Sequence, residues 1–134
     1  IADETRAEID ALALGERILW RDSVSDAQLP AVYNAAVALV MPSFYEGFGM
    51  PALEAMACGT LPIVSNRSSL PEVVGEVGLL IDPDDPQTMT TALALALTDS
   101  IWLSGQVHSA LEQAQRFTWQ RSAQIALEAY TSLV

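Results

Sequence analysis

The sequence predicts an α/β domain built on an open parallel sheet with helices on both faces. Two short apolar runs, Val37–Met41 and Leu61–Ser65, have the composition of strands that are buried on both faces. A third run, Gly78–Ile81, ends at the turn Asp82–Asp85. Segments with helical periodicity separate these runs, and this alternation favours a parallel α/β architecture.

The length of the chain indicates how many domains it forms, and its net charge excludes some kinds of binding partner. The 134 residues correspond to one domain. Six basic residues, all arginine, stand against 17 acidic ones, and the formal net charge is −11. Nucleic acids and anionic membranes bind clustered positive charge, so we expect neither as a partner. Hydrophobic residues make up 51% of the chain, which excludes disorder and leaves much apolar surface for so small a domain to bury.

The cysteine content and the apolar segments indicate the cellular compartment in which we expect the protein. Cys58 is the one cysteine, so no intrachain disulfide can form and a cytoplasmic location is expected. The longest apolar stretch, residues 29–42, is too short and too interrupted to span a membrane, and no signal peptide is evident. Because the chain begins with Ile1, we interpret it as a piece of a longer protein, which could itself lie at a membrane surface.

The elements before the second buried strand follow from local signals. Apolar spacing predicts a helix over Thr5–Gly15, and Ser25–Asp26 is an N-cap signal for a helix that ends at Ala36. Between them, Arg17–Arg21 is predicted as a short strand. After Met41 we expect a glycine-bearing loop to Met50 and then a helix from Pro51 to Gly59.

Helices dominate the rest of the chain. The segment Thr88–Leu97 is ambiguous, because its leucines alternate as in a strand while its alanines favour a helix, and we interpret it as a helix. The other predicted helices are Ser69–Val74, Ile101–Gln115 and Thr118–Leu133.

The loop after the first buried strand is the most informative segment for function. Ligands of open parallel sheets bind at the carboxyl ends of the strands, where this loop lies. Gly47 and Gly49 permit close approach of a ligand to the backbone, and the amides around Met50–Leu53 at the following helix N-terminus suit a phosphate. Glu54, one turn further on, could accept hydrogen bonds from a ribose. Spacing alone favours the simpler interpretation, in which Glu54 complements the helix dipole and Glu46 is a solvated loop residue, because glutamates are common in first turns.

A family resemblance favours the functional interpretation. Glu46 and Glu54 are separated by seven residues, within a stretch that runs from Pro42–Ser43 to Ser65. This stretch resembles the E-x7-E signature of group 1 retaining glycosyltransferases of the GT-B fold. The flanking segments resemble the same family, and they are Ser25–Ala36, Ser69–Val74, Gly78–Asp85 and Phe117–Trp119.

The resemblance implies a role for each matching residue. Glu54 would hold the nucleotide ribose, and Glu46 would approach the donor sugar as the catalytic residue. The amides of Phe48, Gly49 and Met50 would cradle sugar and diphosphate, while Val24 and Ser25 would border the base. The implied reaction is transfer of a sugar from a nucleotide diphosphate sugar to a glycan, lipid or small-molecule acceptor with retention at the anomeric carbon. No metal or cofactor is implied.

The resemblance also implies that residues 1–134 are an incomplete donor-binding domain. The N-terminal acceptor domain and the first strands of this Rossmann-like C-terminal domain would be absent, so the chain by itself is expected to be inactive. With the strand Arg17–Arg21 at a far edge, the sheet would have a gap, and a homodimer or strand exchange could fill it. A non-catalytic nucleotide-binding or interaction fragment on the same fold is the alternative. A dehydrogenase is disfavoured because no G-x-G-x-x-G follows the first strand.

Four further residues, in the later loops and on a later helix, are candidate site residues. Asp82 and Asp84 resemble a metal-binding pair, but Pro83 makes a turn the better interpretation. Arg67 lies at the ligand end of the sheet and is either a phosphate contact or a solvated loop residue. His108 lies on a predicted helix far from the glycine loop and is interpreted as a surface residue.

Overall fold

A three-stranded parallel sheet forms the centre of the molecule. The computed structural model describes residues 3–132, and its strand order is β1 (Ala38–Met41), β2 (Leu61–Ser65), β3 (Leu79–Ile81). In the register, Val40 lies opposite Ile63, and Ile63 lies opposite Leu79. All five residues of β2 are buried, as expected for a central strand covered on both faces.

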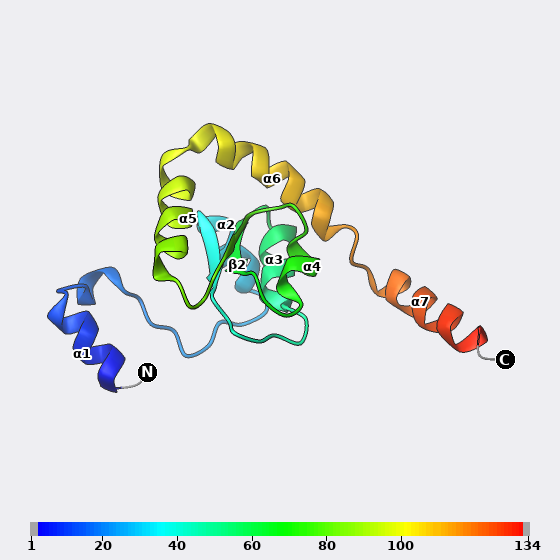
Figure 1. Ribbon diagram of the computed structural model, residues 1–134, viewed down its shortest axis with the longest axis horizontal. Coiled ribbons are helices and arrows are strands. Elements are labelled where there is room, and N and C mark those ends of the chain that lie inside the picture. Colours follow the sequence, from blue (N-terminus) through cyan, green and yellow to red (C-terminus); the bar gives the residue numbers. More distant parts are fainter. Residues whose placement is uncertain (1–2, 133–134) are drawn as a thin grey trace.

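Helices cover both faces of the sheet, which confirms the predicted architecture (Figure 1). Val64 points to one face and packs with α3 (Met50–Ala57), α4 (Leu70–Val74) and α6 (Ser100–Ala114). Leu61 and Ile63 point to the other face and pack against α5 (Pro86–Thr98). This alternation along one strand divides the core into two layers.

The two terminal helices lie apart from this core (Figure 1). Neither α1 (Asp3–Ala11) nor α7 (Trp119–Thr131) has a buried residue. On α7 the apolar side chains of Trp119 and Tyr130 are 84% and 72% exposed. The helix α7 confirms the predicted helix Thr118–Leu133, of which Leu133 lies outside the described residues.

The predicted strand Arg17–Arg21 is wrong. Gly15–Arg17 forms a single 3-10 turn, and the following residues have no regular structure. Leu19 is 76% exposed and has no neighbouring strand. A short β-prone segment needs a pairing partner, and none is offered to it among residues 3–132. The gap that this strand would have left in the sheet does not arise, and β1 and β3 are the two edges of the described sheet.

Several boundaries differ by a few residues from the prediction. The helix expected after Ser25–Asp26 begins later, as α2 (Leu29–Ala35), because residues 26–28 form a turn whose Gln28 amide donates to the Ser25 carbonyl at 2.9 Å. The ambiguous segment is the helix α5, which starts where the Asp85 carboxylate caps the Gln87 amide at 3.0 Å. No helix within residues 3–132 combines the length and apolar character that a membrane crossing requires.

Candidate functional site

The glycine loop, residues 42–49, connects the carboxyl end of β1 to α3. Gly49 ends it in the left-handed conformation, with φ at 100°. A Cβ on Gly49 would lie 2.6 Å from Cδ2 of the buried Leu70. Both the backbone angle and the space therefore require glycine at this position.

The amides around Gly49 differ in whether they are hydrogen-bonded within the protein. The Gly49 carbonyl accepts from the amides of Ala52 and Leu53 at 3.0 and 3.3 Å. The expectation that those two amides are unbonded is therefore wrong. By contrast, the amides of Phe48, Gly49 and Met50 donate to no group within residues 3–132. Three successive unbonded amides beside a helix N-terminus are a donor set that suits an anion.

Two serines from the loop after β2 hold the glycine loop in place. Ser68 Oγ accepts from the Glu46 amide at 2.9 Å. Ser69 Oγ lies 3.0 Å from the Glu46 carbonyl and 2.9 Å from the Phe48 carbonyl and donates to them. The Glu46 backbone is thus hydrogen-bonded on both sides, and its half-buried side chain is carried by a fixed segment. Sequence reasoning missed these serines, because the contacts join residues more than 20 positions apart.

Glu54 lies on α3 and faces α2. Its side chain is half-buried, and Oε2 accepts from the Tyr33 hydroxyl at 3.0 Å. Both residues line a cavity of about 300 Å³ between the two helices. The rest of its lining is mostly apolar and includes Asp26, Leu29, Pro30, Ala57 and Cys58. Carboxylates accept hydrogen bonds, so this cavity has the chemistry to hold a ligand that carries hydroxyl groups.

Val24 and Ser25 lie before this cavity and do not line it. Val24 is half-buried, while Ser25 is exposed and donates from Oγ to the Gln28 side chain at 2.9 Å. The next residue, Asp26, reaches the cavity that contains Glu54. In this part of the chain, the residue that lines the cavity is Asp26, which sequence reasoning did not single out as a site residue.

Charged groups occupy the loops after β2 and β3. Arg67 donates to Asp82 Oδ1 at 3.1 Å and to Asp84, and its guanidinium lies 5.6 Å from the centre of the Phe44 ring. The hydrogen bond to Asp84 is the main reason that the pKa of Arg67 is raised. Asp82 also accepts from the Asp84 amide at 3.0 Å, as in an Asx turn. The turn interpretation of these aspartates fits this geometry, and Arg67 is engaged by carboxylates in this structure.

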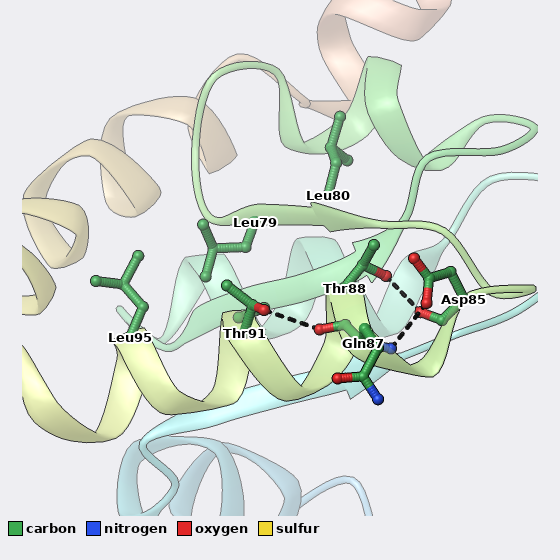
Figure 2. A pocket seen from close by; sticks show the side chains of 8 residues that line it. Leu79, Leu80, Asp85, Gln87, Thr88, Thr91 and Leu95 are labelled. Carbon is green, nitrogen blue, oxygen red and sulfur yellow. Dashed lines mark hydrogen bonds between the residues drawn. The ribbon is translucent and has the colours of Figure 1, made fainter.

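Two larger hollows are lined by neither Glu46 nor Glu54. One, of about 470 Å³, lies between β3 and α5, where the threonines and Asp85 bond to the helix backbone (Figure 2). The other, of about 590 Å³, is lined by Phe48, Met50 and the residues around Phe117. Phe48 contacts Phe117 edge-to-face, with ring centres 5.8 Å apart. The second hollow therefore joins the glycine loop to the start of α7.

The remaining candidate residue is peripheral. His108 is 81% exposed and faces Glu112 on the same helix at 3.4 Å. This agrees with its interpretation as a surface residue. Within residues 3–132, no three His, Cys, Asp or Glu side chains lie close enough together to hold a metal ion.

The parallel sheet, with helices on both faces and a glycine loop at the carboxyl end of β1, defines a Rossmann-like α/β domain of the GT-B type. Residues 2–118 match the family described as glycosyl transferases group 1, and the chain belongs to that family.

The relatives agree with this assignment. O-antigen chain mannosyltransferase B of Escherichia coli is 44% identical over 110 residues, which cover 82% of this chain and 29% of the relative. D-inositol 3-phosphate glycosyltransferase of Corynebacterium glutamicum (strain R) is 37% identical over 123 residues, or 90% of this chain and 29% of the relative.

A solved structure has the same fold. Sucrose-phosphate synthase from Thermosynechococcus elongatus superposes with a TM-score of 0.85 at 32% identity. The match covers 96% of this chain and 33% of that one. The chain thus has the fold of part of a GT-B protein and spans less than a third of the length of the two enzymes above.

Proposed function

We propose that this chain is the donor-binding part of a retaining glycosyltransferase, which transfers a sugar from a nucleotide diphosphate sugar to an acceptor. The observation that carries the proposal is the placement of Glu54. Its carboxylate lines the cavity between α2 and α3, and α3 begins at Met50, the last of the three residues with unbonded amides, Phe48, Gly49 and Met50. Acceptors for ribose hydroxyls and donors for phosphate thus follow one another along one short segment.

In this proposal the glycine loop supplies the electrostatics of the reaction. Negative charge develops on the leaving diphosphate, and preorganised amides stabilise that charge more in the transition state than in the ground state. Glu46 would approach the donor sugar from the segment held by Ser68 and Ser69. We assign no resident metal or cofactor to the site, so a chelator should leave the activity of the complete enzyme unchanged.

The proposed whole enzyme also includes an N-terminal acceptor domain. The relatives are more than three times longer than the segment they share with this chain, and the exposed apolar face of α7 suits contact with another domain. The chain alone would then bind donor without transferring sugar. We place the enzyme in the cytoplasm, where its acceptor domain would dock at a membrane surface.

Calorimetric titration with UDP, GDP and ADP tests the proposal. Charge-assisted hydrogen bonds to ribose contribute about 1.5–3 kcal/mol, so Glu54→Ala should weaken binding roughly tenfold to a hundredfold. Glu76→Ala is the matched control, because Glu76 is exposed and lies outside the site. Equal binding by wild type and Glu54→Ala in the complete enzyme would refute the donor-site proposal and favour the non-catalytic interaction fragment.

Self-association through a sheet edge is a separate part of the proposal. β1 and β3 each pair only with β2 within residues 3–132, so each presents one unpaired edge. The chain should therefore dimerise at high concentration, with or without strand exchange. Light scattering that shows a monomer throughout the concentration range would contradict this.

A further inference from the structure

Glu54 is held by a hydrogen bond that reaches across from another helix. Its Oε2 accepts from the Tyr33 hydroxyl at 3.0 Å, and Tyr33 precedes Glu54 by 21 positions. No group within residues 3–132 donates to the other carboxylate oxygen, Oε1. One oxygen of the carboxylate is therefore fixed by the protein, and the other remains available in the cavity between α2 and α3.

Tyr33 is held by hydrogen bonds at its backbone carbonyl as well as at its hydroxyl. It is 9% exposed, and its carbonyl accepts from Thr60 Oγ1 at 2.7 Å and from the Ala36 amide at 2.9 Å. Thr60 is buried directly before β2, so the end of α2 is tied to the segment that leads into the central strand. The phenol hydroxyl thus donates from a position that the core determines.

The protonation state of this phenol is constant under ordinary conditions. Burial, and after it the hydrogen bond to Glu54, raise the pKa of Tyr33 to about 12. The hydroxyl keeps its proton at every pH at which an enzyme of this kind would work. The donor to Glu54 is therefore always present.

We propose that Tyr33 is a positioning residue that holds the Glu54 carboxylate in the orientation required to accept hydrogen bonds from the vicinal hydroxyls of a ribose. This inference rests on the donor-binding function proposed above. A glutamate on a helix has three rotatable side-chain bonds, and ordering them opposes binding. The bond from Tyr33 orders the side chain before the ligand arrives, so the loss of that bond should weaken only interactions that pass through Glu54.

The test is Tyr33→Phe, which removes the hydroxyl and keeps the ring. Dissociation constants of a nucleoside diphosphate and of its 2′,3′-dideoxy analogue are measured by calorimetry on the complete enzyme and on this chain. We expect Tyr33→Phe to weaken binding of the ribonucleotide about threefold to tenfold, which is the net range of an ordinary hydrogen bond and less than the loss of the carboxylate itself. Binding of the dideoxy analogue, which has no hydroxyls for Glu54, should change less than twofold.

Two controls separate positioning from a general loss of structure. Tyr130→Phe is the matched control, because Tyr130 is 72% exposed on α7, outside the glycine loop and the cavity, and it should change neither dissociation constant. In a Glu54→Ala background, Tyr33→Phe should have no further effect. Glu54→Asp is a second, independent variant, since it keeps the charge but withdraws the carboxylate from the Tyr33 hydroxyl, and it should also lower the preference for ribose.

The possible results separate a failure of the positioning role of Tyr33 from a failure of the proposed donor-binding function. Equal losses for the ribonucleotide and the dideoxy analogue would mean that Tyr33 acts through the fold, and no loss for either would mean that it does not orient Glu54. Both results overturn the positioning role alone. A wild-type enzyme that fails to prefer the ribonucleotide, or that is insensitive to Glu54→Ala, would overturn the proposed function and the inference together.

Discussion

Gly49→Ala provides the sharpest test of the glycine loop. The residue has φ at 100°, where a side chain on an L-residue costs about 1–2 kcal/mol. The new Cβ would also lie 2.6 Å from Cδ2 of Leu70, which is fully buried and must repack at a cost of about 1–2 kcal/mol. Together the two effects should lower the free energy of unfolding by about 2–4 kcal/mol.

Thermal unfolding followed by circular dichroism measures this loss. For a chain of this size, a kcal/mol corresponds to about 3–4 °C, so the melting temperature should fall by roughly 6–16 °C. Gly47→Ala is a matched control in the same loop, because nothing lies within 4 Å of its Cβ position and its φ is outside the left-handed region. If Gly49→Ala melts within 2 °C of Gly47→Ala, the argument from φ and from Leu70 is wrong.

Three further predictions concern the loop, a helix and the buried phenol. Ser69→Ala removes the donor to two loop carbonyls and should weaken nucleotide binding several-fold, measured by calorimetry, while Ser104→Ala on α6 should not. Gly105→Ala should raise the free energy of unfolding in urea by about 0.5–1 kcal/mol, because the site is helical and open; a loss of stability would contradict this. The pKa of Tyr33 is raised from 10.0 to about 12, so the folded state favours the protonated phenol. The contribution of this shift to the free energy of unfolding is complete below pH 10 and is lost as the pH rises through 12. Urea unfolding across that range should show the loss in wild type and a smaller one in Tyr33→Phe, and equal losses would refute the assignment.

The parts of the fold that could be predicted are those with strong local signals. The buried strand Leu61–Ser65 has the predicted bounds, because a short apolar run after a glycine is typical of a central strand. The segment Arg17–Arg21 also contains three successive apolar residues, but it has no neighbouring strand, and Leu19 and Trp20 are exposed. Strand formation depends on a partner, which local sequence does not specify.

The same distinction applies to the site. Glu46, Glu54 and the glycines lie within nine residues and carry a recognisable pattern. The contacts that hold them come from Tyr33, Ser68 and Ser69, at separations of 21 to 23 positions. Tyrosine and serine at those places have many other uses, so only the folded chain shows which loop and which carboxylate they serve.

The distribution of charge at the site leads to a last prediction. The loop supplies amide donors for a diphosphate, but Arg67 is held by Asp82 and Asp84, and the chain carries a formal net charge of −11. Amides alone bind phosphate less strongly than amides with arginine or lysine.

In the proposed function, Glu54 binds the nucleoside, and much of the positive charge that binds the diphosphate comes from residues outside this chain. The isolated chain should therefore bind a nucleoside and its diphosphate with affinities within about tenfold of each other, whereas the complete enzyme should prefer the diphosphate far more strongly. Titrations with both ligands, repeated at high salt, measure the difference. If the isolated chain already shows the full preference for the diphosphate, the amides of Phe48, Gly49 and Met50 suffice and external positive charge is not required.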